Sequence, residues 1–246
     1  MSYNSSPLWR RGGGEERVHS NLFNKSFRIQ TWFLTLLCSA LAGCVGVSTG
    51  QELAVVTRAQ MQMGTLVKIT AVARSESIAQ AAATAGFAEI RRLEEILSTW
   101  IPTSELSRVN TSAGVMPVHV SPETLMVVQR AIQVAQMTDG GFNIAIGPAV
   151  DAWSVTDSRR IPTDSELEAL RPLVDLMSVH VDLEKQTIYL GKAGMRIDVG
   201  GIGKGYAADQ AVDALRRAGA IAGVVALSGD IKTYGRLPDG KMFPVG

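Results

Sequence analysis

Residues 197–209 carry the clearest chemical signal in the chain, and they read Ile197-Asp198-Val199-Gly200-Gly201-Ile202-Gly203-Lys204-Gly205-Tyr206-Ala207-Ala208-Asp209. The pattern predicts a strand that leads into a glycine turn over 197–201, followed by a helix from about Lys204 to Ala218. Glycines leave backbone N–H groups accessible, a helix start attracts negative charge, and Lys204 adds a cation. The segment is therefore suited to binding a diphosphate.

Two common phosphate-binding motifs do not match this segment. A P-loop has Ser or Thr after its Gly-Lys pair and a Gly five residues before that pair's Gly, whereas here Gly205 follows Lys204 and the earlier position is Asp198. The dinucleotide-binding motif needs G-x-G-x-x-G early in a βαβ unit, and that spacing is missing. A glycine turn that only allows tight packing remains an alternative for the segment taken alone.

Composition narrows the class of protein. The 246 residues are 46% hydrophobic and 19% charged, which is enough for a core in one large domain or two small ones. Lys and Arg total 24 against 23 Asp and Glu, so we expect no nucleic-acid partner, which would need a clustered basic face. Two cysteines and three dispersed histidines give no disulfide framework and favour no His/Cys metal centre.

The N-terminus resembles a targeting signal. Its apolar run is about a dozen residues long, which suits a signal-peptide core and is shorter than the roughly 20 residues that span a bilayer. The run ends in Leu41-Ala42-Gly43-Cys44, which resembles a bacterial lipobox. We therefore expect a signal peptide over 1–43, lipidation at Cys44, a tether over 44–55, and a lipoprotein anchored to the membrane and facing the periplasm. The alternatives are an ordinary signal peptide with an incidental cysteine, or a buried helix.

The remaining pattern mixes strands and helices without strict alternation, which favours an α+β fold over a doubly wound sheet. Expected helices cover 76–97, 122–137 with Ser121 as its cap, and a segment opening at Thr163. Expected strands cover 61–72, 115–120, 224–227 and 231–234, and 174–190 is expected to be a hairpin. Residues 98–114 are expected to be a polar loop, and 138–153 a Gly/Pro-punctuated segment.

Four further segments stand in order around residues 197–209: Met63-Gly64-Thr65; Ser98-Thr99-Trp100 through Asn110; Asp139-Gly140-Gly141-Phe142-Asn143 with Gly147-Pro148-Ala149-Val150-Asp151-Ala152-Trp153; and Leu227-Ser228-Gly229-Asp230-Ile231. Together the five segments resemble the ApbE family of FAD:protein FMN transferases, over about residues 61–246. The resemblance implies an ApbE-like architecture of two subdomains over 56–246, with mixed sheets flanked by helices.

The resemblance also implies roles for individual residues. Met63 and Trp100 would contact the flavin, with Trp100 stacking on a ring, although core packing is an alternative for both. The residues that would line the pocket or hold FAD are Gly141, Phe142, Asn143, Asp198 and Lys204. The carbonyl of Gly201 would be a magnesium ligand. Most relatives have Asp where Asn143 stands, so this chain lacks a charge there but keeps a hydrogen-bonding group.

The implied activity is magnesium-dependent transfer of the FMN half of FAD to a threonine of an acceptor flavoprotein, with release of AMP. An FAD pyrophosphatase and a non-catalytic flavin-binding lipoprotein are the alternatives. Family members continue past the Ser228-Gly229-Asp230 turn, and their later segments bring an Asp and a Thr to the magnesium site. We therefore expect 56–246 to be a partial domain, incomplete at its C-terminus, either as a fragment or as a natural truncation.

Overall fold

The computed structural model describes residues 52–154 and 160–245, which lie within one compact unit, Gln51–Gly246. The predicted signal peptide and Cys44 lie outside the described residues. In the described part of the chain, no helix combines the length and apolar character needed to cross a bilayer.

A four-stranded sheet forms the first half of the unit, with strand order β1-β2-β6-β7. Its strands are β1 (Ala54–Gln62), β2 (Thr65–Ala73), β6 (Ala222–Leu227) and β7 (Asp230–Tyr234). Each neighbouring pair is antiparallel. In β2, Val67, Ile69 and Ala71 are fully buried while Leu66 and Lys68 are exposed, which is the alternation expected of a sheet covered on one face.

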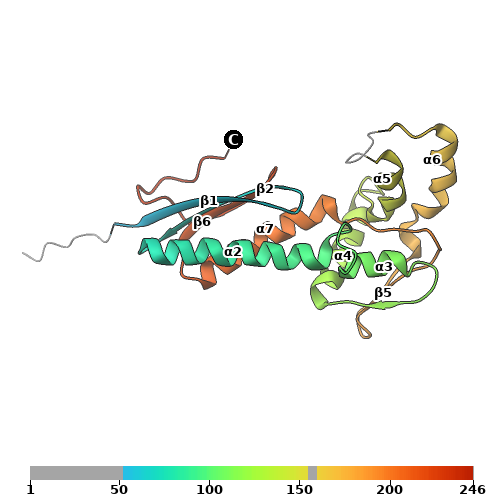
Figure 1. The fold of residues 1–246 in the computed structure, drawn as a ribbon, viewed down its shortest axis with the longest axis horizontal. Helices are drawn as coiled ribbons and strands as arrows, with labels where there is room; N and C mark the ends of the chain where they lie inside the picture. Colours follow the sequence, from blue (N-terminus) through green and yellow to red (C-terminus); the bar gives the residue numbers. More distant parts are fainter. Residues whose placement is uncertain (1–51, 155–159, 246) are drawn as a thin grey trace, which may run out of the picture. The chain divides into compact units, whose positions relative to one another are not determined.

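Two long helices, α2 (Glu76–Leu97) and α7 (Gly200–Arg217), lie along the sheet (Figure 1). The predicted bounds of α2 are confirmed, and its N-cap, Ser75, accepts a hydrogen bond from the Ile78 amide. Small residues bring the two helices together, because a Cβ added to Gly86 would lie 2.5 Å from Leu215 Cδ1. A larger residue at position 86 would require the buried side chains of Leu215 and Ile69 to shift.

The second half of the unit is built from shorter elements. Its helices are α3 (Glu105–Thr111), α4 (Pro122–Met137), α5 (Gly147–Trp153) and α6 (Asp164–Leu170), with 3-10 helices η2 (Ile144–Ile146), η3 (Arg171–Leu173) and η4 (Leu176–Ser178). The strands β3 (Val118–His119), β4 (Val179–Asp182) and β5 (Thr187–Leu190) form an antiparallel sheet of order β3-β5-β4. The predicted helix over 122–137, the hairpin within 174–190 and the helix opening at Thr163 are confirmed.

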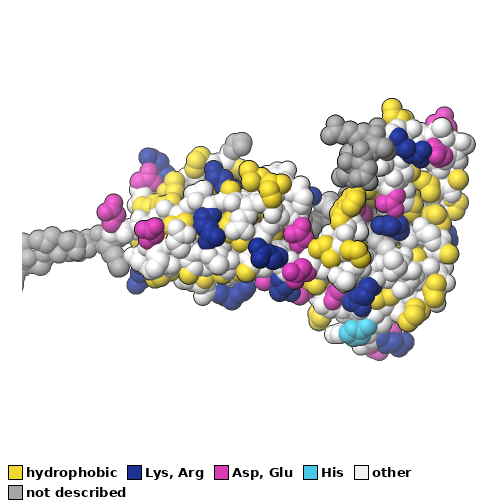
Figure 2. All heavy atoms as spheres, viewed as in Figure 1, with side chains coloured by type: hydrophobic (Ala, Val, Ile, Leu, Met, Phe, Trp, Pro, Cys, Tyr) yellow, Lys and Arg dark blue, Asp and Glu magenta, His cyan; other side chains and the backbone are white. Residues whose placement is uncertain are grey.

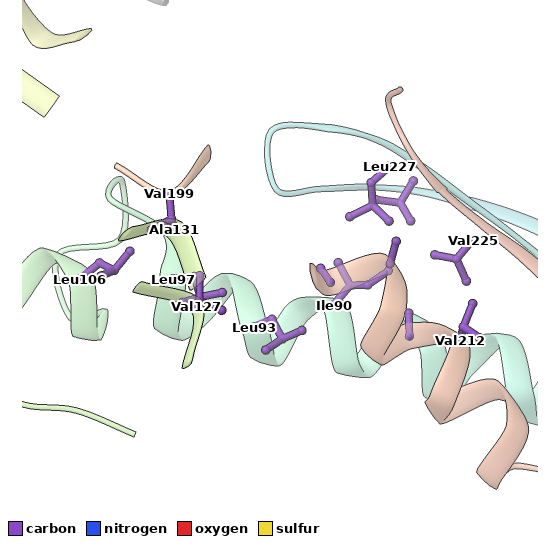
Figure 3. Packing of buried hydrophobic residues seen from close by; sticks show 14 of the residues in the cluster. Ile90, Leu93, Leu97, Leu106, Val127, Ala131, Val199, Val212, Val225 and Leu227 are labelled. Atoms are coloured by element: carbon purple, nitrogen blue, oxygen red, sulfur yellow. The ribbon is translucent and has the colours of Figure 1, made fainter. Parts of the chain in front are cut away.

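One hydrophobic core joins the two halves. Figure 3 shows it running from Val225 and Leu227 on the sheet, past Ile90, Leu93 and Leu97 of α2. It ends at a group in the second half, of which Figure 3 labels Leu106, Val127, Ala131 and Val199. On the face shown in Figure 2, Lys and Arg side chains are interspersed with Asp and Glu. The α+β class is confirmed, and all strand pairs among the described residues are antiparallel.

The structure corrects two expectations about the elements near the site. Residues 61–72 are not one strand, because the chain turns at Met63-Gly64 between β1 and β2, and β1 begins at Ala54, inside the segment expected to be a tether. Residues 98–114 are not only a loop, because they contain α3. That helix has only seven residues, too few for an apolar period to stand out in the sequence.

Candidate functional site

A pocket of about 570 Å³ lies where the β1–β2 turn, the end of α2 and the start of α7 meet. Its lining includes Met63, Glu94, Trp100, Asp198 and Lys204. Four of these five were identified from the sequence as candidate site residues, and they come from three segments far apart in the chain. The fold therefore brings the predicted residues Met63, Trp100, Asp198 and Lys204 to one cavity.

The β1–β2 turn is held in a left-handed conformation on one wall of this pocket. Met63 has φ 49° and Gly64 has φ 68°, as a type I′ hairpin turn requires. A left-handed non-glycine residue costs of order 1 kcal/mol, and here the Met63 amide donates a 2.7 Å hydrogen bond to Glu94 Oε1. Sequence reasoning missed Glu94, because nothing in its helical spacing distinguishes it from the other charged residues of α2.

Trp100 forms another part of the wall and is 69% exposed. This exposure contradicts the alternative that Trp100 is a core residue. Its backbone amide donates to Ser98 Oγ at 3.1 Å, which fixes the loop while leaving the indole free. Met63, in contrast, is partly buried against the core and also lines the pocket, so packing and contact with a ligand are compatible at that position.

The segment leading to Asp198 is not the predicted strand. It is held by separate contacts instead of a strand ladder. Both backbone groups of Ile197 bind the side chain of Asn110: the Ile197 amide donates to Asn110 Oδ1 at 2.8 Å, and Asn110 Nδ2 donates to the Ile197 carbonyl at 3.0 Å. The Asp198 amide donates to the carbonyl of Ile144 at 2.8 Å. The local sequence of a paired strand and of an extended segment held by separate contacts is equally apolar. The pattern therefore suggested a strand.

The helix that follows begins earlier than predicted, at Gly200 instead of near Lys204. Asp198 Oδ1 accepts the Gly200 amide at 2.6 Å, and Val199 O accepts the amides of Ile202 and Gly203 at 2.9 and 2.7 Å. Most of the N–H groups expected to be bare are thus already bonded. Among the first four amides of α7, those of residues 200–203, only that of Gly201 has no partner in the described part of the chain.

Lys204 therefore lies one turn inside α7, and not at its start as predicted. Its Nζ is 3.5 Å from the carbonyl of Gly200, and in the described part of the chain no carboxylate pairs with it. Lys204 and the second oxygen of Asp198 are both available to a ligand in the pocket. Counting Glu94 as well, the pocket has two carboxylates and one ammonium group, so a bound diphosphate would face net negative charge unless a cation accompanied it.

Of residues 141–143, Phe142 lies next to the first turn of α7. The ring of Phe142 would be 2.9 Å from a Cβ on Gly201, so a larger residue at position 201 would require the ring to shift. Asn143 caps η2, with its Oδ1 accepting the Ala145 amide at 2.8 Å. Gly141 is exposed. None of the three lines the 570 Å³ pocket.

Gly201 lines a second cavity, of about 620 Å³, together with Gly205, Tyr206 and Asp230. Burial raises the pKa of the Tyr206 hydroxyl above its usual value, so at neutral pH this side chain is a neutral hydrogen-bond donor. Among residues 52–154 and 160–245, no three His, Cys, Asp or Glu side chains are grouped as metal ligands.

The chain matches the ApbE family over residues 63–246. It is 31% identical over 166 residues to an FAD:protein FMN transferase of Klebsiella pneumoniae, and 33% identical over 156 residues to one of Vibrio cholerae. These alignments cover 67% and 61% of this chain but 52% and 46% of the relatives, so the chain spans about half the length of the curated relatives it matches.

Solved structures show the same likeness. The flavin transferase ApbE from Vibrio cholerae superposes with a TM-score of 0.72 at 27% identity, covering 78% of this chain and 63% of that one. The ApbE protein from Thermotoga maritima gives 0.69 at 26% identity, covering 76% and 61%. The fold class expected from the five sequence segments is thereby confirmed.

Proposed function

The chain belongs to the ApbE family, and on this premise we propose that it transfers the FMN half of FAD to a threonine hydroxyl of an acceptor protein, with AMP as the leaving group. The observation that carries the proposal is the convergence of Met63, Trp100, Asp198 and Lys204 on one pocket. A volume of about 570 Å³ is within the range of pockets for organic ligands.

Different parts of the pocket lining suit the two chemical parts of a flavin nucleotide. The exposed indole of Trp100 offers a flat face for stacking on an isoalloxazine ring, and the flexible Met63 side chain can pack beside it. In another part of the lining, the Lys204 ammonium, which pairs with no carboxylate among the described residues, favours phosphate oxygens near the N-terminus of α7. On this proposal Gly141, Phe142 and Asn143 contact the cofactor beyond the lining of this pocket, where Phe142 lies next to Gly201.

The proposed reaction is a phosphoryl-type transfer. The threonine oxygen forms a bond to the phosphorus of the FMN half, and the bond from that phosphorus to the bridging oxygen of the diphosphate breaks. AMP leaves with that oxygen, and the threonine proton passes to a base. No nucleophile on this chain is required, so the work of its residues is to position FAD and balance its charge, which is how phosphoryl-transfer enzymes generally act.

Magnesium enters the proposal through the family resemblance, with the carbonyl of Gly201 as a candidate ligand. The described residues alone do not form a magnesium cage, since they contain no cluster of three metal-ligating side chains. A magnesium site that uses few protein ligands takes further oxygens from water and from substrate phosphates, and the excess of carboxylates in the pocket favours a cation beside a diphosphate.

Incubation of the chain with FAD, magnesium and a threonine-bearing acceptor tests the proposal. Flavin bound covalently to the acceptor supports transfer. Free FMN together with an acceptor that carries no flavin would instead indicate an FAD pyrophosphatase. FAD that is bound but unchanged would indicate a non-catalytic flavin-binding protein. A parallel incubation without magnesium separates binding from metal-dependent turnover.

We also propose that the protein is a lipoprotein anchored through Cys44 and facing the periplasm. The support is the sequence Leu41-Ala42-Gly43-Cys44 after an apolar run, and this segment lies outside the described residues. Cys44→Ser should remove the acylation site and release the protein into the soluble extracytoplasmic fraction. Retention of Cys44→Ser in the membrane fraction would contradict the lipobox and favour an uncleaved helix.

A further inference from the structure

Asn110, near the end of α3, is a buried polar residue that the reaction chemistry does not use. It is 8% exposed, and both polar atoms of its amide are bonded to Ile197, 87 positions along the chain. Ile197 itself is fully buried and has no strand partner, so its N–H and C=O would be unsatisfied without Asn110. An unmade buried hydrogen bond is costly, so the pair is a strong local restraint.

We propose that Asn110 is a positioning residue of the flavin site: it holds Ile197 so that Asp198 and the first turn of α7 face the pocket. The inference rests on the proposed function for the identity of the ligand. Its geometric part rests on three consecutive residues that are held by two other parts of the chain, the η2–α5 stretch and α3. Arg196 O accepts the Gly147 amide at 3.2 Å, Ile197 is held by Asn110, and the Asp198 amide donates to Ile144 O.

Helix α3 also connects this restraint to the Trp100 wall of the pocket. Its N-cap Ser104 accepts the Ser107 amide at 3.0 Å and donates its hydroxyl to the carbonyl of Ser98, two residues before Trp100. One short helix thus fixes the loop that carries Trp100 at one end and the segment that carries Asp198 near the other. Movement of α3 would change both walls together.

The chemistry of asparagine explains why this residue type stands here. A primary amide offers one acceptor and one donor in a single plane, and so can pair with the N–H and C=O of one backbone residue at once. Alanine offers neither. An ionised aspartate offers two acceptors, which would oppose the carbonyl of Ile197, whereas a protonated aspartic acid again offers one donor and one acceptor.

Hydrogen exchange of backbone amides in the full chain, without FAD, tests the geometric part. Asn110→Ala should speed exchange at Ile197–Gly200 by on the order of tenfold relative to wild type, the usual effect of losing a buried hydrogen bond. Exchange in β2 and β6 should change much less. Val109→Ala is the matched control, because Val109 is buried in the same helix but does not bind Ile197.

Asn110→Asp provides a second variant whose effect can be reversed within one sample. Burial raises the pKa of a carboxyl group, so the acid form should be populated at mildly acidic pH. There, exchange at Ile197–Gly200 should approach the wild-type rate, and above the pKa it should exceed that rate by on the order of tenfold. Arg196 and Asp198 flank Ile197 in both proteins, so each rate is divided by that of wild type at the same pH.

Fluorescence titration with FAD, run on the same samples, separates this proposal from the proposed function. We expect weaker FAD binding wherever Ile197–Gly200 exchange faster. Failure of the wild-type chain to bind FAD would count against the proposed function, and the exchange result would still test whether Asn110 positions Ile197. The role of Asn110 as a positioning residue is overturned if Asn110→Ala leaves exchange at Ile197–Gly200 unchanged, or if the exchange rate in Asn110→Asp does not depend on pH. It is also overturned if Val109→Ala speeds exchange at Ile197–Gly200 equally, or if protection is lost uniformly across the sheet.

Discussion

The two halves of the described unit are held together differently. In the half built from β1, β2, β6, β7, α2 and α7, the buried side chains are nearly all apolar and pack between the sheet and the two helices. In the segment from α3 to the start of α4, buried polar groups are concentrated: Ser104, Ser107, Asn110 and Thr124 lie there, and Gln62 is the one other buried polar residue in the described chain.

The apolar contacts therefore contribute mainly to stability, whereas the buried polar contacts contribute mainly to the geometry of the site. Apolar burial is non-directional, so it holds elements together without fixing a particular backbone atom in place. Hydrogen bonds from side chains to backbone are directional and set the position of one residue. The candidate pocket lies at the junction, with the rigid apolar half supplying α2 and α7 and the polar contacts setting how Trp100 and Asp198 face it. The predictions below test whether the two effects can be separated.

The largest effect is expected in the apolar half. Ile90 is fully buried on α2, so Ile90→Ala should lower the free energy of unfolding by about 2–5 kcal/mol, through lost burial and the cavity left behind. Urea denaturation would measure it. Ile78→Ala is the matched control, since Ile78 is 36% exposed on the same helix and should cost much less. FAD affinity of the folded Ile90→Ala protein should stay close to wild type, and a large loss would show that the halves are not separable.

A binding effect of intermediate size is expected at Lys204. Lys204→Ala should weaken FAD binding by about 1.5–3 kcal/mol, the value of a hydrogen bond to a charged group. The free energy of unfolding should change little, because among the described residues the Lys204 ammonium makes one long hydrogen bond and no ion pair. Titration followed by flavin fluorescence measures affinity, with the distant surface variant Lys185→Ala as the control. Equal affinity of Lys204→Ala and wild type would remove Lys204 from the site.

A comparable or smaller loss of FAD affinity is expected when Trp100 is replaced. Trp100→Ala should weaken FAD binding by about 1–3 kcal/mol, as for other aromatic groups that stack on a base. Its exposure predicts almost no change in melting temperature. Trp100→Phe should keep much of the affinity, since it keeps a stacking face. Trp153→Ala removes another partly exposed indole, outside the lining of the pocket, and should leave binding unchanged.

The smallest effect is expected at a surface ion pair in the second half. Hydrogen bonds from Lys192 and then Ser178 lower the pKa of Asp175 from 3.8 to about 2. Because the folded pKa is the lower one, the carboxylate contributes stability above about pH 4, and that contribution is lost as pH falls toward 2. Asp175→Asn should thus lower the melting temperature slightly at neutral pH, and the difference should shrink below pH 4. A difference that grows on acidification would contradict the assignment.

Several features were determined by the sequence alone. The apolar period of α2 and its Ser75 cap predicted the bounds 76–97, and Ser121-Pro122 predicted the start of α4. Long periodic segments can be predicted because their signal is local and repeated. The order of the five motif segments predicted the family, and with it the four candidate residues that the pocket brings together.

Only the tertiary structure decided how that pocket is built. It showed that α7 begins at Gly200 and that Ile197 is held by Asn110, where the local pattern had suggested a strand and a later helix start. It also showed that Glu94 holds the Met63 turn across 31 positions of sequence. A hydrogen bond between one side chain and a backbone group far along the chain produces no periodic pattern and no local propensity in the sequence, so it cannot be predicted from either. Local sequence thus predicted the long periodic elements, while the contacts that position the site followed from where the folded core brought the elements together.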